Sequence, residues 1–195
     1  MFGKTYSVIK LLALKVKFGK RLNIGKVRQI IRADTEIRVG KDAFLSLVSV
    51  NVNTNVHLVC EHGVLIIGEG AIFNRNCTVV CRQKIQIGDH CLFGPNVCIF
   101  DHDHIFDSNG VSAEKFECSE IVIEEGCWIG AGSIILRGTH IGKNSVIGAG
   151  TVIKGHIPPH SMVLSSRDPR VIPMSFFAQQ TENHNSLYIK KASTE

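Results

Sequence analysis

Isoleucine recurs every six residues in the second half of the chain, and this spacing is the strongest pattern in the sequence. An α-helix repeats every 3.6 residues and a simple strand every two, so neither element generates a period of six. The pattern predicts a solenoid in which each hexad is one short strand followed by a turn, and three hexads close a triangular coil. The repeated positions are Ile123, Ile129, Ile135, Ile141, Ile147 and Ile153.

A second column of small residues supports the same solenoid. Small side chains stand two places before the later isoleucines, and side chains two apart on a strand share a face. Each hexad therefore sends one isoleucine and one small residue into the interior, while glycine or asparagine occupies the turn and tolerates a positive φ. The small residues are Cys127, Ser133, Thr139, Ser145 and Thr151, and the turn residues are Gly126, Gly132, Gly138, Asn144 and Gly150.

The same register extends upstream with less regularity, and we expect the coils to begin near Val39 and Gly40. A two-residue slip separates two runs of the pattern. The first run is Ile67, Phe73, Val79 and Ile85, and the second is Ile87, Phe93 and Ile99.

Residues 101–119 interrupt the hexads and are expected to project from the solenoid as a loop, a common place for function. The loop opens with Asp101-His102-Asp103-His104. The predicted organisation is a helical or irregular cap at 1–35, a β-helix at 36–157 with this excursion, and a tail at 158–195. Pro158 and Pro159 are expected to end strand pairing, because proline cannot donate to a ladder.

The N-terminal segment resembles a basic amphipathic helix. Two alternatives remain open: a cap on the open end of the solenoid, or peripheral contact with an anionic membrane through residues 4–21. The segment is too short and too charged to cross a bilayer, and no cleavable signal peptide is evident. Its apolar residues, expected on or near one face, are Val8, Ile9, Leu11, Leu12 and Val16, with Lys4, Lys10, Lys17, Lys20 and Arg21 outside it.

Composition narrows the class of protein. With 195 residues, 44% hydrophobic and 20% charged, the chain fits a single globular domain. The net charge of +5 comes from scattered basic residues, so we expect no nucleic-acid partner. The seven cysteines contain no Cys-x-x-Cys pair, which favours buried packing residues in a reducing cytoplasm.

From about residue 60 to 172 the chain resembles hexapeptide-repeat acyltransferases, especially sugar and polysaccharide O-acetyltransferases related to the maltose and galactoside enzymes. The Ile129-Gly130, Ile141-Gly142 and Ile147-Gly148 pairs carry the resemblance. It implies an all-β left-handed parallel β-helix, a homotrimer with each active site between two solenoids, and acetyl-CoA as cosubstrate. The expected function is acetyl transfer to a sugar hydroxyl by a cytoplasmic enzyme.

His104 is the expected general base. Pro95-Asn96-Val97 leads without a gap to His104, at the place of the family's catalytic histidine. A hydroxyl attacking a thioester must lose its proton, and a neutral imidazole can accept it. Asp101, Asp103 or Glu120 is expected to orient the ring, with His102 in support. The family has proline after its histidine where Ile105 stands here, and the Asp-His-Asp-His form looks more like capsule and lipopolysaccharide O-acetyltransferases.

Two positions are expected to bind the acceptor sugar. Asn74 matches an acceptor-binding asparagine of the galactoside enzymes, although it is equally typical of a corner asparagine with positive φ. Arg82 stands where that family has an acidic sugar ligand, so it favours an anionic acceptor such as a uronic acid or a nucleotide sugar.

The cofactor wall is expected along the regular coils. Because Ile129 points inward, Trp128 should point outward and mark a ligand or partner surface. By resemblance, the pantetheine arm passes small residues of this wall and basic residues hold the coenzyme A phosphates. The small residues are Gly130, Ala131 and Ala149, and the basic residues are Lys154, Arg167 and Arg170.

Three other functions compete. An N-acetyltransferase on an amino sugar or a nucleotide-linked amino sugar would use the same histidine, and a non-catalytic assembly subunit would use none. A zinc site would need His102 and His104 with a third ligand such as His90 or His140. Their spacing does not match the histidine pattern of the carbonic anhydrases that share this fold, so no metal is expected.

Overall fold

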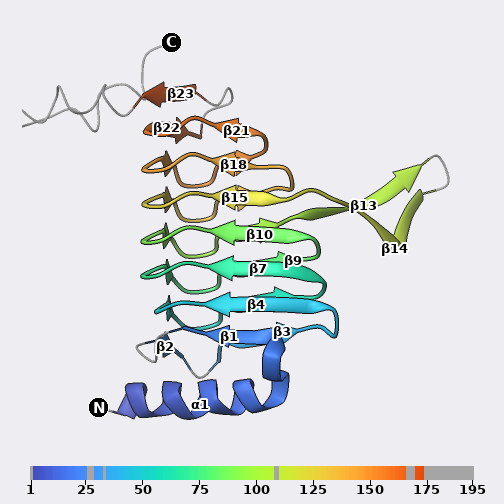
Figure 1. The fold of residues 1–195 in the computed structure, drawn as a ribbon. Coiled ribbons are helices and arrows are strands. Elements are labelled where there is room, and N and C mark those ends of the chain that lie inside the picture. The colour runs from blue at the N-terminus through green and yellow to red at the C-terminus, as the bar shows by residue number, and fades with distance from the viewer. Residues whose placement is uncertain (1, 26–28, 33, 108–109, 166–169, 174–195) are drawn as a thin grey trace, which may run out of the picture.

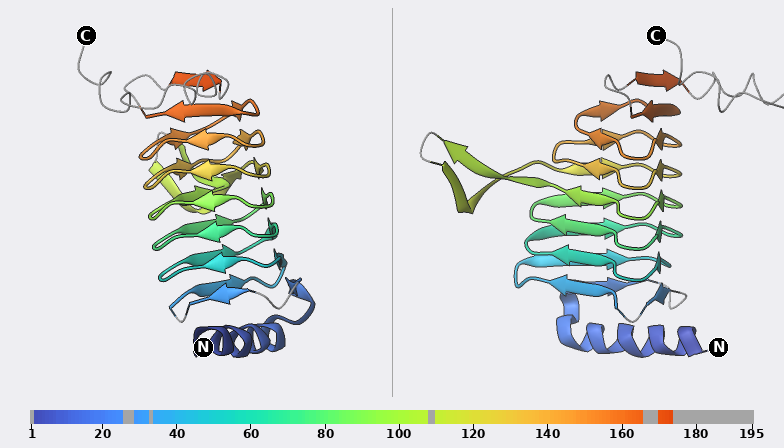
Figure 2. Two further views of the ribbon diagram at one scale, coloured as in Figure 1. Left: turned by 90° about the vertical axis from the view of Figure 1, so that its left-hand side faces the viewer. Right: turned by 180° about the vertical axis from the view of Figure 1, so that it is seen from behind.

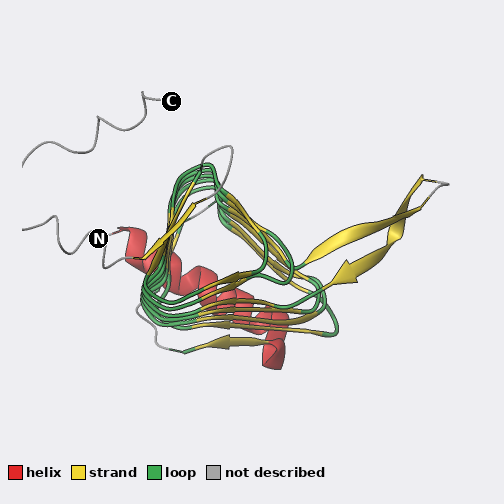
Figure 3. Ribbon diagram, turned by 90° about the horizontal axis from the view of Figure 1, so that it is seen from above, coloured by secondary structure: helices red, strands yellow, loops and turns green. Residues whose placement is uncertain are grey.

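The computed structural model describes residues 2–25, 29–32, 34–107, 110–165 and 170–173. It begins with helix α1 (Phe2–Phe18) and a short 3-10 helix (Gly19–Arg21), and the following chain winds into a solenoid of short strands (Figure 1). Seen along its axis, the solenoid is a triangle with one sheet on each side (Figure 3). It is a left-handed parallel β-helix, as the resemblance implies.

Each of the three sheets takes one strand from each coil, except that the last coil adds none to the third sheet among the described residues. The first sheet contains β1 (Leu22–Ile24), β4 (Ala43–Leu47), β7 (Gly63–Ile67), β10 (Lys84–Ile87), β15 (Ile121–Ile123), β18 (His140–Ile141) and β21 (His156–Ile157). The second contains β2 (Ile30–Ile31), β5 (Asn51–Val52), β8 (Ile72–Phe73), β11 (Leu92–Phe93), β16 (Trp128–Ile129), β19 (Val146–Ile147), β22 (Ser161–Leu164) and the antiparallel β23 (Arg170–Pro173). The third contains β3 (Glu36–Val39), β6 (His57–Cys60), β9 (Thr78–Cys81), β12 (Cys98–Phe100), β17 (Ile134–Ile135) and β20 (Val152–Ile153).

Two edges of the triangle carry the candidate site residues. The asparagine edge, between the second and third sheets, is named for Asn55, Asn76 and Asn96, whose side chains form a ladder of hydrogen bonds of 2.9 and 3.1 Å. The hairpin edge lies between the third and first sheets. There β13 (His102–Asp107) and β14 (Gly110–Cys118) leave the solenoid as an antiparallel hairpin (Figures 1 and 3).

The interior confirms the hexad prediction. All six repeated isoleucines are at most 4% exposed, and so are the five small residues that precede them. The small hydroxyl side chains are satisfied by the backbone; Ser133, for example, donates to the Gly148 carbonyl at 2.9 Å. The five predicted turn residues all have positive φ, between +55° and +75°. Five of the seven cysteines are buried, and Cys98 and Cys118 are half-buried.

The two-residue slip between Ile85 and Ile87 has a structural cause. Strand β10 is four residues long and sends both isoleucines inward, so it supplies two large interior side chains where a regular hexad supplies one isoleucine and one small residue. Early coils are accordingly longer: Leu65 pairs with Ile85, 20 residues on, whereas Ile135 pairs with Ile153, 18 residues on.

The solenoid starts earlier than predicted. Strand pairing begins at Leu22, which is fully buried and pairs with Leu45, so the expectation of a start near Val39 is wrong. The first coil keeps the six-residue spacing only between the buried Ile31 and Ile37, and strand β1 before them is defined by pairing with the next coil.

Helix α1 lies across the N-terminal end of the solenoid (Figures 1 and 2). The Ser7 hydroxyl donates to the Ile31 carbonyl and accepts from the Ile31 N–H, both at 3.1 Å, while Leu11 and Phe18 are buried. The predicted single apolar face is therefore wrong, because Ile9, Leu12 and Val16 are exposed on the other side of the helix. No helix in the described part of the chain is long and apolar enough to cross a membrane.

The projecting segment is an ordered hairpin rather than an irregular loop. The chain passes this edge in six residues between Ile135 and Ile141 but takes 24 between Ile99 and Ile123, so the hairpin adds three hexads' length and preserves the register. Its strands stand well clear of the body (Figure 2, right).

The prolines at 158 and 159 do not end strand pairing. Strand β22 follows them and pairs with β19, with Met162 opposite Val146. The prediction is wrong because the prolines lie next to a turn between strands, where no ladder hydrogen bond is required of them. The rest of the predicted tail, 174–195, lies outside the described residues.

Candidate active site

Asp101 fixes the base of the hairpin. Its carboxylate is fully buried and accepts backbone N–H groups of Arg82, Gln83 and Lys84 at 2.8–2.9 Å. It also accepts from Nδ1 of His102 at 3.0 Å. These donors come from the preceding coil, so Asp101 ties the start of the hairpin to the solenoid.

His102 packs against the base of the hairpin next to Asp101. Its side chain is 14% exposed, and its ring meets Phe100 and Phe116 edge-on at centroid distances of 6.3 and 5.4 Å. Because Nδ1 bonds Asp101 and the ring packs between two phenylalanines, the His102 side chain is part of the packing at the base of the hairpin.

His104 lies further out on β13 and is exposed. Its Nδ1 lies 2.9 Å from the carbonyl oxygen of Ser112 on β14. A carbonyl only accepts, so Nδ1 carries a proton, and in the neutral ring Nε2 is left as an acceptor. The ring also packs on Phe116 at 4.4 Å. The hairpin thus holds one imidazole in a defined tautomer.

The opposite face of the hairpin is bound by Arg137. Asp103 and Glu117 are cross-strand partners, and two carboxylates there would repel each other. Arg137 donates to both, from Nε to Asp103 at 2.5 Å and from the guanidinium tip to Glu117 at 2.6 Å. The hydrogen bond with Asp103 is the main cause that raises the pKa of the Arg137 guanidinium. Arg137 therefore connects the hairpin to the coil above it.

The carboxylates expected to orient His104 are bound elsewhere. Asp101 contacts His102, Asp103 contacts Arg137, and Glu120 pairs with Lys84 at 3.0 Å. Strand alternation sends Asp103 to the face opposite His104. A backbone carbonyl occupies the position expected for a carboxylate.

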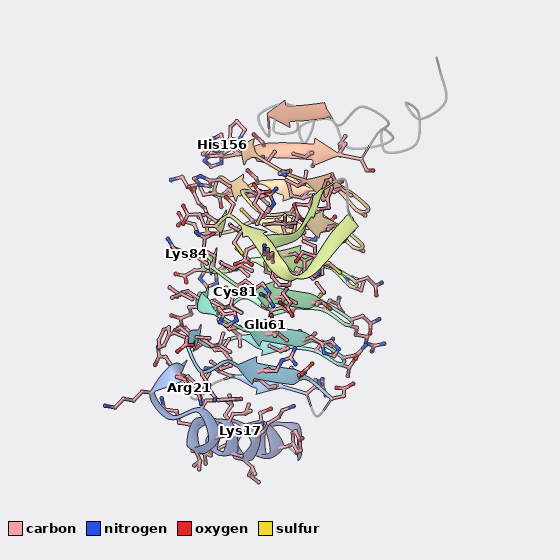
Figure 4. The ribbon with its side chains drawn as sticks, turned by 90° about the vertical axis from the view of Figure 1, so that its right-hand side faces the viewer. Lys17, Arg21, Glu61, Cys81, Lys84 and His156 are labelled. Carbon is pink, nitrogen blue, oxygen red and sulfur yellow. The ribbon has the colours of Figure 1, made fainter. Side chains whose placement is uncertain are left out.

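Arg82 is engaged within the chain. It pairs with Glu61 at 2.6 Å, and its guanidinium stacks on the Phe116 ring at 3.5 Å from the centroid. Figure 4, which faces the hairpin, shows Glu61 just below it. Arg82 and His104 therefore rest on the same ring, and this geometry fits support of the hairpin better than contact with an anionic acceptor.

The other predicted residues lie away from His104. Asn74 sits at the asparagine edge, where its side chain accepts the Arg75 N–H at 2.8 Å. The positive φ expected there belongs to Asn76 instead. Gly130 and Ala149 lie on stacked turns of the same edge, and a Cβ on Gly130 would come within 2.5 Å of the Ala149 nitrogen. The Ala131 carbonyl accepts a hydrogen bond from the Gly150 N–H at 2.8 Å.

Trp128 faces outward on the second sheet and is 53% exposed, as strand alternation predicts. It continues a column of outward apolar side chains, since Ile72, Leu92 and Trp128 occupy one register and are each more than 40% exposed. Such a column is typical of a contact surface.

The predicted phosphate ligands are only partly described. Lys154 is exposed at the hairpin edge, one coil beyond Arg137. Arg170 begins β23, and its side chain lies outside the described residues, as does all of Arg167.

The histidines considered as further metal ligands have other partners or positions. His140 lies on the first sheet, 2.8 Å from Glu124 and 5.0 Å from the His156 ring. His90 occupies a turn between the first and second sheets with a φ of +57°. Among the described residues, no group of three or more His, Cys, Asp or Glu is arranged to hold a metal ion.

Comparisons with known proteins identify the family. Residues 120–155 match the model described as bacterial transferase hexapeptide (six repeats). A galactoside O-acetyltransferase from Lactococcus lactis subsp. lactis (strain IL1403) is 42% identical over 91 residues, which cover 47% of this chain and 44% of the relative. WbbJ of Escherichia coli (strain K12), whose name assigns it to O-acetyl transfer in lipopolysaccharide biosynthesis, is 28% identical over 142 residues, covering 68% of this chain and 69% of the relative.

A solved structure extends the match. A maltose O-acetyltransferase from Clostridium difficile 630 superimposes with a TM-score of 0.54 at 33% identity, covering 69% of this chain and 67% of that chain. The chain spans about half the length of the first curated relatives it matches, such as 44% of the galactoside enzyme. The chain belongs to the hexapeptide-repeat, left-handed β-helix acyltransferases.

Proposed function

We propose that the protein is an acetyl-CoA-dependent O-acetyltransferase acting on a hydroxyl of a sugar or polysaccharide precursor. The observation that carries the proposal is the setting of His104: a carbonyl 2.9 Å from Nδ1 on an exposed hairpin of a hexapeptide solenoid. A neutral imidazole held this way offers Nε2 as the acceptor for a proton. The names of the relatives support the reaction type and the sugar acceptor.

His104 is the general base of the proposed reaction. Its Nε2 accepts the proton of the acceptor hydroxyl as that oxygen bonds to the thioester carbonyl carbon. Backbone N–H groups, with that of Ala131 as the candidate, stabilise the resulting oxyanion. The C–S bond then breaks, the imidazolium returns the proton to the leaving sulfur, and the products are an acetyl ester and coenzyme A.

The proposed active site is shared by two chains of a homotrimer. Within one chain, His104 leaves the hairpin edge while Ala131 and Ala149 lie at the asparagine edge. The third sheet, whose strand in this coil is β17, lies between the two edges. A neighbouring solenoid can bring its asparagine edge and Trp128 to the hairpin of the first. Exposed apolar residues on both surfaces, such as Trp128 and Phe106, support such contact.

Supporting roles follow from this arrangement. We assign His102, Asp101 and Asp103 to holding the hairpin, and Arg82 to the ring of Phe116, which supports His104. Three further groups of residues are assigned to binding. Asn74 binds the acceptor and Lys154, Arg167 and Arg170 bind the coenzyme A phosphates. The pantetheine arm lies along Trp128, Gly130, Ala131 and Ala149.

The proposal places the enzyme in the cytoplasm, the compartment that supplies acetyl-CoA, with peripheral membrane contact through the N-terminal helix. An acceptor presented near a membrane would suit a precursor of a surface polysaccharide, in line with the name of the WbbJ relative.

Release of coenzyme A thiol tests the function. Purified protein is incubated with acetyl-CoA and a panel of neutral sugars, uronic acids, amino sugars and nucleotide sugars, and the acetylated product is identified by mass spectrometry. The proposal expects an alkali-labile ester on a sugar hydroxyl. An amide on an amino sugar would instead establish N-acetyl transfer, and absence of acceptor-dependent thiol release would contradict both.

A further inference from the structure

Helix α1 has a second apolar face that the solenoid does not cover. The inner face, with Leu11 and Phe18, closes the end of the solenoid. On the other side lie Ile9, Leu12 and Val16, the outer stripe, exposed by 62%, 62% and 86%. Their spacing of three and four residues aligns them along the helix. A surface helix of a globular protein usually places polar residues there, so this stripe indicates a surface that meets an apolar partner.

Positive charge is unevenly distributed along the sequence, contrary to the expectation that the basic residues are scattered. The first 33 residues contain nine Lys and Arg and no Asp or Glu, whereas the remaining 162 contain 13 basic and 17 acidic residues. Lys17 and Lys20 are exposed near the C-terminal end of the helix. The nine basic residues are Lys4, Lys10, Lys15, Lys17, Lys20, Arg21, Lys26, Arg28 and Arg32.

Two lysines of the helix also hold it in place. Lys10 donates from Nζ to the carbonyls of Arg32 and Thr35 at 3.0 and 2.7 Å, and Lys15 donates to the Leu22 carbonyl. Their side chains reach toward the solenoid. They therefore add charge around the helix without crossing the outer stripe.

The shape of this end suits a flat surface. Helix α1 runs across the solenoid end, roughly perpendicular to the axis, and the hairpin projects sideways from the body (Figures 1 and 2). The face of the helix that points away from the coils can thus lie against a plane over its full length. An interfacial helix binds in this orientation, with apolar side chains among the acyl chains and basic ones at the headgroups.

We propose that the outer stripe is a docking surface for an anionic lipid membrane. This deepens the proposed peripheral contact by naming the surface and the lipid charge it requires. Pairing of two such ends from two copies would bring together two segments that are each strongly basic and have no acidic residue in the first 33 positions, so charge disfavours a second copy as the occupant. Basic residues spread over the whole segment fit a continuous negative surface.

Vesicle flotation of the full chain tests the proposal. Vesicles of phosphatidylcholine mixed with phosphatidylglycerol are compared with phosphatidylcholine alone. We expect binding to the anionic vesicles only. Replacing the stripe by Ile9→Gln, Leu12→Gln and Val16→Gln should weaken binding by about tenfold or more, and Lys20→Gln by about fivefold. Val152→Gln, an equally exposed apolar residue near the other end, is the matched control and should bind like the parent chain.

Thermal melting of the triple variant shows whether α1 still caps the fold. We expect the melting temperature to stay near that of the parent chain, because glutamine keeps helix propensity and the stripe lies outside the core. The proposal is overturned if the parent chain does not float with anionic vesicles, or if a folded triple variant floats equally well. It is also overturned if light scattering shows that the stripe instead pairs two copies end to end. Vesicle binding requires neither acetyl-CoA nor an acceptor, so its failure and the failure of acetyl transfer are separate results.

Discussion

At the scale of single residues, His104 and Asp103 are neighbours with different surroundings because strand alternation sends them to opposite faces of the hairpin. His104 meets Phe116 and the Ser112 carbonyl, and Asp103 meets Arg137. The sequence identifies the four polar residues of the Asp-His-Asp-His segment but does not show their partners. The Ser112 partner of His104 stands 8 residues away and the Arg137 partner of Asp103 stands 34 residues away, and only the folded hairpin brings them together.

Asp101→Ala is expected to destabilise the protein by about 3 kcal/mol or more, because it leaves several buried N–H donors without their acceptor. Asp103→Ala is the matched control. Its carboxylate is 44% exposed, so its loss should cost about 1 kcal/mol or less. Chemical denaturation gives both free energies of unfolding, and equal losses would refute the structural role of Asp101.

Phe116→Leu is expected to lower kcat by about tenfold while the KM for acetyl-CoA stays unchanged, because the ring that positions His104 is lost. Phe116→Tyr keeps the ring and should restore the rate. Steady-state kinetics of the two variants measure this. A Leu variant as active as the parent, or a Tyr variant as impaired as the Leu variant, would show that the Phe116 ring does not position His104.

At the scale of elements, the regular coils could be predicted from the sequence because a hexad is a local pattern. The interior isoleucine, such as Ile129, and the interior small residue, such as Ser133, recur as buried positions through the regular coils. The start of the first coil and the hairpin have no such repeat, since strand β1 is defined by pairing with β4 and strand β13 by pairing with β14. The prediction of a single apolar face on helix α1 is wrong for a related reason. The apolar residues of the helix form two faces, and contact with the first coil determines which of the two is buried.

Glu124, which follows β15, supplies a pH-dependent link between coils. Its hydrogen bond with His140 is the main cause that lowers the pKa of the Glu124 carboxyl. The folded pKa lies below the unfolded one, so the stabilisation is present above the unfolded pKa and is lost as the pH falls through the folded pKa. The two side chains are 43% and 36% exposed, which limits the contribution to about 1 kcal/mol or less.

Glu124→Gln should therefore lower the free energy of unfolding near neutral pH, and the difference from the parent chain should shrink in acid. Denaturation curves at several pH values measure it, with Glu125→Gln as the control on the neighbouring exposed carboxylate. A difference that grows as the pH falls would have the opposite sign to the one expected here.

At the scale of the whole molecule, exposed apolar surface lies on the hairpin and the second sheet, which the proposed trimer would cover, as well as on the outer stripe of α1. Phe106 and Val111 face each other on the hairpin and are 77% and 72% exposed, and Trp128 belongs to the apolar column on the second sheet. The candidate base and the candidate cofactor wall lie at different edges of one chain. In the proposed function, these two parts of the site therefore come from two chains.

Light scattering should give a mass near three times the 21.4 kDa chain. Phe106→Asp is expected to dissociate the assembly and abolish acetyl transfer together, because a charge replaces an apolar contact and the second wall of the site is lost. The control is Ile9→Gln, which changes an equally apolar exposed side chain at the far end and should leave the mass unchanged. An active monomer would exclude a shared site.

The most direct test of the proposed function is the rate of acetyl transfer by His104→Ala. Loss of a general base is expected to lower kcat by about 10² to 10⁴, with the KM for acetyl-CoA and the melting temperature nearly unchanged. His156→Ala, on the first sheet away from the hairpin, should keep the parent rate. If His104→Ala retains most of kcat in an assay where the parent chain transfers acetyl groups, His104 is not the base and the proposed mechanism is wrong.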